Sequence, residues 1–432
     1  MRATILIVLA SVGLVAVLPH GGQAASPLRP KAITPLPLGR IVPTGWYRDL
    51  LLQQMHSLSG NLSRFWPDVR YAPWFGGNGT AQGNRMHERG PYWLNGALPL
   101  AYLLTTNATD AHRRAFGPGG PPPPPLARRR RLRGREGEDV MGVGGSVPFE
   151  HVHPPCGDGS NAGCPPANNT YPPWSSQRLV EECEHWVEFM YSNRNTSNGW
   201  LGNWRNPGVP DGNGEYWTHW NVHNAMRMYN NFHEATGIGP GPGLPTTAAI
   251  RAALIADALE ARRRMTGDPK TDPTCVPLGP KVPWSSSRWP EWAFILHQMI
   301  DTFPEVRANA TLEAALLDAA SVTQRDGFPW MEAFFTNKSF PKCGNCATPG
   351  TGPGWDMHSH GVNGMMALKQ GPVWWRQSGN QSDLDGVATR LGLYDTYHGQ
   401  AHGFWSADEC IGGRAPGRGV ELCAIVEAML VI

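Results

Sequence analysis

The chain has 432 residues, enough for one large domain or two ordinary ones, and its 41% of hydrophobic residues can supply a large core. Only 17% of the residues are charged and the net charge is +2, which argues against a nucleic-acid-binding protein. Tryptophan is abundant, with 18 residues. Because flat aromatic rings stack on the apolar faces of sugars, this content favours a carbohydrate ligand, although the same side chains could simply fill a core.

The N-terminus has the pattern of a secretory signal. Met1 and Arg2 give a positively charged end, an apolar run extends from Ile5 to Leu18, and small residues precede Ala25. Residues 1–24 are therefore predicted to be a signal peptide, with an apolar run too short to span a membrane comfortably. We expect a protein that is secreted or stays in the secretory-pathway lumen, without a membrane partner. Its eight Asn-x-Ser/Thr sequons predict a glycoprotein.

Eight cysteines in an oxidising compartment predict disulfides, and their pairing cannot be assigned from spacing. Cys343 and Cys346 form the only Cys-x-x-Cys motif. A zinc knuckle would need a second such motif, so a tight disulfide is the favoured interpretation of this pair.

The rest of the chain predicts an all-α fold. Residues 25–43 are a Pro-rich lead-in, and residues 115–175, with five consecutive prolines and an arginine-rich run, are predicted to be a disordered insertion within a domain spanning 44–432. Apolar spacing and breakers predict helices over 45–58, 92–104, 177–193, 216–236, 246–265, 289–303, 309–323, 361–379 and 384–397. Helices of similar length joined by aromatic and Gly-rich loops predict antiparallel pairs, which can close into an (α/α)6 toroid with a pocket at one end.

Chemical groups concentrate near the C-terminal end, between Tyr397 and Glu427. Glu421 and Cys423 are two residues apart, so they can share a target only just before a helix or in its first turn, and we expect that helix to run from about Ala424. A carboxylate and a thiolate could be two of the four ligands of a zinc site. The alternative is a buried cysteine next to a capping glutamate.

Glu409 lies on the aromatic loop that contains Trp405. An apolar wall would raise the pKa of this carboxyl group and suit it to act as the acid of a glycosidase, so Glu409 is the catalytic candidate and Trp405 a sugar-contacting candidate. Glu409 could also be an ordinary loop carboxylate. Nearby histidines could bind sugar hydroxyls or a metal, and among them we single out His360 and His398.

Several blocks of the sequence resemble the β-L-arabinofuranosidase group, glycoside hydrolase family 127 and its relatives. The resemblance covers most of residues 40–432 outside the insertion. The blocks read GWYRDLLLQQMHSLSGNLSRFWPDVR, HERGPYWLNGALPLAYLL, HSHGVNGMMALKQGPVWWRQSG, YHGQAHGFWSADECIGG and GVELCAIVEAM.

The resemblance implies an (α/α)6 barrel followed by β-domains, and a retaining mechanism with a zinc-bound cysteine nucleophile. It implies that Glu421 and Cys423 hold Zn²⁺ and that Glu409 is the acid/base. It also implies that His360 and His223 contact the sugar, an arabinofuranose-type glycan.

One feature of the family is missing, because the chain has no adjacent Cys-Cys pair to supply the nucleophile and two further zinc ligands. We therefore expect a chain that stops before the last barrel helices and the β-domains and that hydrolyses glycosides poorly or not at all. Two alternatives stay open: a non-catalytic carbohydrate-binding glycoprotein, and a polysaccharide lyase on an α/α toroid.

Overall fold

The computed structural model describes residues 28–31, 33, 35–75, 88–106, 176–202, 216–280, 282–342, 357–407, 409–414 and 419–430. These residues are mostly helical and form no β-strand, only isolated bridges such as Ala407 with Ile411. The predicted all-α class is confirmed at this level. Within the same ranges, every helix is too short or too polar to span a lipid bilayer. The predicted signal peptide and the insertion at 115–175 lie outside the described residues.

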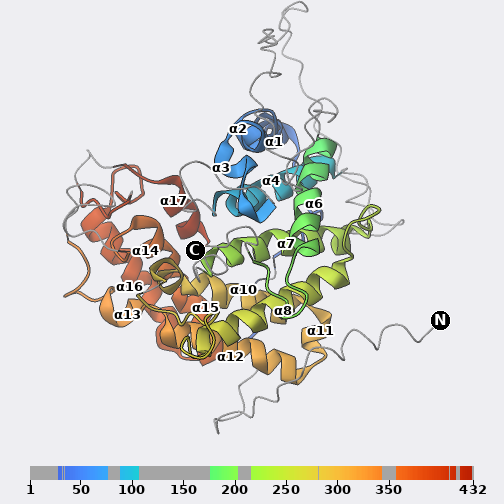
Figure 1. Cartoon of the computed structure of the whole chain (residues 1–432). Coiled ribbons are helices and arrows are strands. Elements are labelled where there is room, and N and C mark those ends of the chain that lie inside the picture. Colours follow the sequence, from blue (N-terminus) through green and yellow to red (C-terminus); the bar gives the residue numbers. More distant parts are fainter. Residues whose placement is uncertain are drawn as a thin grey trace, which may run out of the picture.

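The helices are labelled in Figure 1. In chain order they are α1 (Gly45–His56), α2 (Leu58–Phe65), α3 (Pro67–Arg70), the 3-10 helix η1 (Pro73–Phe75), α4 (Arg89–Thr105), α6 (Ser176–Ser192), α7 (Trp217–Thr236), α8 (Thr247–Thr266), α9 (Pro283–Ser287), α10 (Trp289–Thr302), α11 (Pro304–Arg307), α12 (Ala310–Asp326), α13 (Trp330–Ala333), α14 (Gly361–Leu368), α15 (Gln370–Ser378), α16 (Gln381–His398) and α17 (Leu422–Met429).

Local sequence explains where several long helices begin and end. The Asn309 side chain caps α12 by accepting from the backbone N–H groups of Thr311 and Leu312, both at 3.1 Å. Thr246 caps α8 in the same way. Helix α7 ends just before Gly237, whose φ of 69° lies in the left-handed region that glycine adopts without strain. These signals are visible in the sequence, and the predicted helices at these places are confirmed.

The helix predicted over 361–379 is two helices, so its continuity was wrong. Helix α14 ends at Leu368 and α15 begins at Gln370. Pro372 has no N–H to donate to the Leu368 carbonyl, so a continuous helix would lose a hydrogen bond at this point. Lys369, between the two helices, has its side chain buried.

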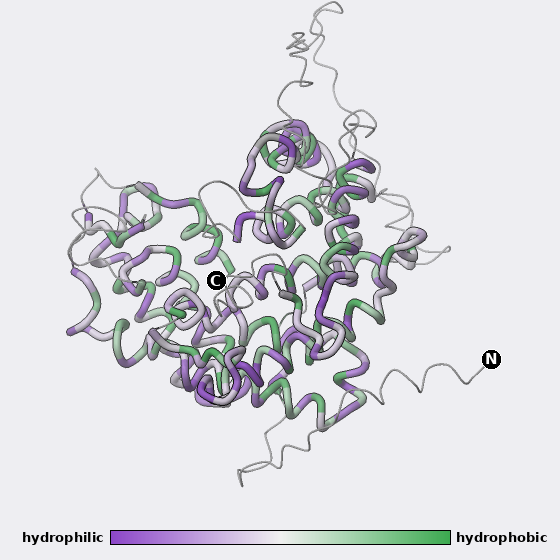
Figure 2. Tube along the Cα trace, viewed as in Figure 1, coloured by the Kyte–Doolittle hydropathy of each residue, from purple (hydrophilic) through white to green (hydrophobic). Residues whose placement is uncertain are grey.

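The helices pack in a regular succession. Helix α4 packs against α6 and α7, α7 against α8 and α10, and α10 against α12 and α15, while α16 packs on α15 and α17 packs on α14. Helices α7 and α10 bury most of their residues, whereas α12 and α16 bury a minority of theirs. Figure 1 shows α7 and α10 near the centre of the molecule, and Figure 2 shows hydrophobic and hydrophilic residues alternating along the helices.

Much of the tryptophan content fills the core. The largest fully buried side chains include five tryptophans: Trp74, Trp186, Trp289, Trp292 and Trp330. The core-filling interpretation of tryptophan therefore holds for these five, and a sugar-binding surface must use other aromatic residues.

The described cysteines are of two kinds. Cys183, Cys275 and Cys423 are free. Cys410 is disulfide-bonded, to a partner outside the described residues. The pair predicted between Cys343 and Cys346 also lies outside them.

Candidate functional site

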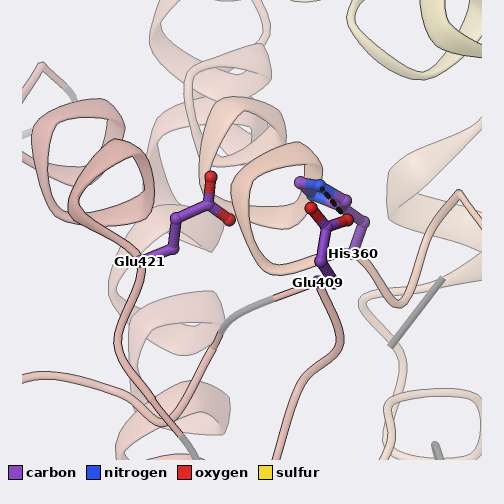
Figure 3. A group of neighbouring side chains, drawn as sticks. All are labelled: His360, Glu409 and Glu421. Atoms are coloured by element: carbon purple, nitrogen blue, oxygen red, sulfur yellow. Dashed lines mark ion pairs between the residues drawn. The ribbon is translucent and has the colours of Figure 1, made fainter. Parts of the chain in front are cut away.

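Three of the predicted site residues come together near the N-terminal ends of two packed helices, α14 and α17. His360 immediately precedes α14, Glu421 immediately precedes α17, and Glu409 lies on the loop that leads to α17. One potential ligand atom from each of these side chains lies within 4.8 Å of the other two. Figure 3 shows the Glu421 carboxylate extending toward the pair formed by His360 and Glu409. Because α14 and α17 pack against each other, the fold itself sets this proximity.

The backbone fixes which nitrogen of His360 carries the proton. His360 Nδ1 accepts from the backbone N–H of Val362 at 3.1 Å and of Asn363 at 3.4 Å, as the cap of α14. The neutral ring then has its proton on Nε2, which donates to Glu409 Oε2 at 3.2 Å. His360 cannot cap the helix and offer an Nε2 lone pair to a metal at once. It is therefore better suited to donate a hydrogen bond than to ligate an ion.

The surroundings of Glu409 differ from those of a general acid, which must be protonated before the reaction. The hydrogen bond from His360 holds the pKa of Glu409 below its ordinary value, helped by the charges of His360 and Arg288, while partial burial opposes the shift. Its side chain is 54% exposed. The expected raised pKa was wrong because Glu409 faces an N–H donor and a guanidinium instead of an apolar wall. Glu409 is thus a carboxylate at neutral pH.

Glu421 and Cys423 lie where their spacing predicted, at the start of a helix. Glu421 is the last extended residue before α17, and Cys423 is in the first turn. Partial burial, together with the neighbouring Glu421 carboxylate, raises the pKa of the Cys423 thiol to about 11. Glu421 Oε2 is buried and has no hydrogen-bond partner among the described residues. A buried carboxylate oxygen without a partner is costly, so this atom is the natural contact for a cation.

Arg288 is a site residue that the sequence did not reveal. It immediately precedes α10, and its Nε donates to Asn363 Oδ1 at 2.7 Å. Its Nη1 donates to the Tyr92 hydroxyl at 3.1 Å. The guanidinium lies over the rings of Trp217 and Trp284, 4.6 and 4.7 Å from their centroids. These partners come from four separate segments, and no local pattern distinguishes Arg288 from the other arginines.

Trp405 and His398 are engaged elsewhere. Trp405 is buried, packs on Tyr394 and donates from Nε1 to Asp395 at 2.6 Å. His398 is also buried, and it donates from Nε2 to the Pro341 carbonyl at 2.8 Å while Nδ1 accepts from the Gly413 N–H at 2.9 Å. Their own partners already use these polar atoms, so the structure does not bring either residue into the group of His360, Glu409 and Glu421.

His223 belongs to a different buried group. It lies on α7, and its Nε2 is 2.8 Å from Asp257 Oδ2, which also lies 3.2 Å from Nδ1 of His219. Burial lowers the pKa of His223. The group joins α7 to α8, and its role in sugar contact stays a prediction.

The environment of His398 predicts an acid-sensitive fold. Burial lowers the pKa of His398 from 6.5 to about 4. Between these values the unfolded chain binds the proton and the folded chain does not, so His398 stabilises the fold above about pH 6.5 and this contribution is lost toward pH 4. The loss is worth about 3 kcal/mol in the free energy of unfolding, measured by urea titration from pH 7 to pH 4. A His398→Gln variant should show a shallower pH dependence, whereas His402→Gln, at an exposed position, should not. Equal slopes for His398→Gln and the unmodified protein would contradict this.

Comparison of the chain with protein-family models, with curated proteins and with solved structures found no match. The resemblance to the β-L-arabinofuranosidase group therefore rests on the sequence blocks quoted above.

Proposed function

We propose that this protein is a secreted glycoside hydrolase-like protein whose site, in front of α14 and α17, binds Zn²⁺ and an arabinofuranose-type sugar. The observation that carries the proposal is the convergence of His360, Glu409 and Glu421, with Cys423 in the first turn of the helix that Glu421 precedes. These residues were singled out from three separate stretches of sequence. A cluster of carboxylates, a thiol and an imidazole N–H is suited both to a cation and to sugar hydroxyl groups.

The residues present supply part of the ligand set of a zinc ion. The partnerless buried oxygen of Glu421 and the adjacent Cys423 sulfur are both donors that zinc accepts, and Glu409 lies within reach of Glu421. Zinc bound there would supply positive charge that favours the thiolate form of Cys423. His360, with its proton on Nε2, is kept for hydrogen bonding.

The protein side chains have distinct tasks in this proposal. Glu409, a carboxylate held by His360, can accept a hydrogen bond or a proton from a sugar hydroxyl group or from water. His360 can donate from Nε2 to the same ligand. Glu421 immediately precedes α17, and Cys423 lies in the first turn of that helix.

The packing order supports an (α/α)6 toroid as the proposed architecture. Helices α4, α7, α10 and the α14–α15 pair contact one another in succession, and each has a second helix packed against it. Alternation of this kind along the chain is what paired helices arranged in an arc would give. In this arrangement the site lies at the ends of α10, α14 and α17 where their N-termini meet.

The second candidate is a non-catalytic carbohydrate-binding protein. The observation that favours it is the low pKa of Glu409, since a group that is already ionised cannot protonate a leaving group. This candidate has the same sugar-binding site as the first but does not hydrolyse the bound glycoside.

A paired binding and turnover assay tests the proposal. The zinc-loaded protein is titrated with p-nitrophenyl β-L-arabinofuranoside by calorimetry, and p-nitrophenol release is followed in the same samples. We expect binding that weakens about 10- to 100-fold in Glu409→Gln, because a charged hydrogen-bond acceptor is lost. The matched control is Glu332→Gln, an exposed carboxylate on α13, which should bind as the unmodified protein does.

Turnover that disappears in Glu409→Gln supports a hydrolase, and binding without turnover supports the carbohydrate-binding alternative. No binding at millimolar glycoside would contradict both candidates.

A further inference from the structure

We propose that Glu88 is the general acid of the site and protonates the leaving oxygen of a bound glycoside, while Glu409 accepts a proton from the attacking water. This inference rests on the hydrolase function proposed above and adds a catalytic residue to that site.

The start of helix α4 is tied to the site by a hydrogen bond. Glu88 immediately precedes α4, and its carbonyl accepts from the Tyr92 N–H at 3.0 Å. Residues four apart are neighbours on one face of a helix, so the side chains of Glu88 and Tyr92 share a face of α4. The Tyr92 hydroxyl group accepts from Arg288 Nη1 at 3.1 Å. This face of α4 is therefore held against the residue that precedes α10.

The Glu88 carboxyl group lies among the charged groups of the site. It interacts electrostatically with Arg288, His360 and Glu409. These three residues come from separate segments: Arg288 precedes α10, His360 precedes α14, and Glu409 lies on the loop that leads to α17. The start of α4 thus supplies a second carboxyl group to the site, on a different element from Glu409.

The two carboxyl groups have different environments. Glu409, 54% exposed, accepts from His360 Nε2 at 3.2 Å, and this hydrogen bond holds its pKa below the ordinary value. Glu88 is half-buried, and burial raises its pKa. The charges of Arg288 and Arg89 oppose the rise, and the charge of Glu409 adds to it. Two carboxyl groups with pKa values moved apart are the arrangement of a general acid and a general base.

The other groups near Glu88 on α4 do not supply an unbalanced charge. Arg89 is paired with Asp68 of α3. Burial raises the pKa of Tyr92 to about 12, so its hydroxyl group is neutral at neutral pH.

The remaining charges of the site balance within two groups. Lys369 is paired with both Glu291 and Glu427. Zinc held by the Glu421 carboxylate and the Cys423 thiolate would have its two positive charges matched by two negative ligands. Neither group leaves an excess of positive charge that would ionise the proposed acid.

The proposed reaction is a single displacement by water. Glu88 gives its proton to the glycosidic oxygen as the bond from that oxygen to the anomeric carbon breaks, and the oxygen keeps the bonding electron pair. Water forms the new bond to the anomeric carbon and gives a proton to the Glu409 carboxylate. One water is consumed, and both carboxyl groups return to their starting states when a proton passes back through solvent.

Two glycosides with different leaving groups test the role of Glu88. The p-nitrophenolate group leaves without being protonated, whereas the methoxy group of methyl β-L-arabinofuranoside must take a proton as it leaves. We expect Glu88→Gln to lower kcat/KM at least about 100-fold for the methyl glycoside and less than about 10-fold for the p-nitrophenyl glycoside. Release of the free sugar by the zinc-loaded protein is measured for both, and Glu332→Gln, exposed on α13, is the control that should keep both rates.

The pH profile of the unmodified protein gives a second readout. A general acid works only while it is protonated, so kcat/KM for the methyl glycoside should fall as the pH rises through the raised pKa of Glu88. This fall should be absent for the p-nitrophenyl glycoside, and absent for both glycosides in Glu88→Gln.

Each other result has a separate meaning. Equal losses for the two glycosides in Glu88→Gln would overturn its role as the acid, and so would unchanged rates. Identical pH profiles for the two glycosides in the unmodified protein would also overturn it, even if Glu88→Gln does not fold. Binding of both glycosides without turnover would overturn this inference and leave the carbohydrate-binding candidate standing. If neither glycoside binds, the proposed function fails as well.

Discussion

Replacement of Lys369 by methionine is expected to lower the free energy of unfolding by about 3–5 kcal/mol, the range for removing one partner of a buried ion pair. The Lys369 side chain, between α14 and α15, is only 5% exposed and is paired with Glu291 of α10 and Glu427 of α17. Without the ammonium group, two buried carboxyl groups would face each other unpaired. Burial already raises the pKa of Glu291 despite the opposing charge of Lys369.

Urea unfolding followed by tryptophan fluorescence measures this effect. Lys270→Met removes an exposed lysine and serves as the matched control, with an expected change of at most about 0.5 kcal/mol. Combining Lys369→Met with Glu291→Gln and Glu427→Gln should recover part of the loss, because the charges left behind are removed as well. A loss below about 1 kcal/mol in Lys369→Met would show that the network does not hold α17 in place.

Replacement of Glu421 by glutamine is expected to weaken zinc binding at least about 100-fold, because changes around metal ligands already cost 10- to 100-fold in affinity. The substitution keeps the size of the side chain and removes its negative charge. It should leave α17 intact, because the Glu421 side chain makes no capping hydrogen bond to that helix.

Competition with a chromogenic zinc chelator at pH 7.5 measures the affinity. Cys423→Ser should weaken binding to a similar degree, since the hydroxyl group does not replace a thiolate ligand. Glu332→Gln on the exposed side of α13 is the control that should bind zinc normally. Equal zinc affinity in Glu421→Gln and the unmodified protein would show that the ion, if bound, is held elsewhere.

The long helices could be predicted because their signals are local. Asn309 and Thr246 are capping residues that mark the starts of two helices, and Gly237 marks the end of a third. Between such residues, the spacing of apolar side chains indicates a helix. Short helices such as α9, α11 and α13 were not predicted, since four or five residues carry too little periodicity. The break at Lys369 was missed because the apolar pattern continues through it. Pro372 did indicate a break, since proline has no N–H to donate within a helix.

The site was partly predictable for a similar reason. The spacing of Glu421 and Cys423 limited them to a helix start, and the quoted sequence blocks pointed to Glu409 and His360. The direction of a loop side chain is set by its partners, and those are distant in sequence. Trp405 therefore donates a hydrogen bond to Asp395 and does not face the site. The contacts of Arg288 are with residues distant in sequence, so no local pattern predicts them.

The most direct test of the central claim is to locate zinc in crystals of the zinc-loaded protein by anomalous diffraction at the zinc absorption edge. We expect one strong peak in contact with a Glu421 carboxylate oxygen and Cys423 Sγ, with His360 Nε2 still donating to Glu409. Crystals with no peak beside Glu421 and Cys423, at full zinc loading, would contradict it.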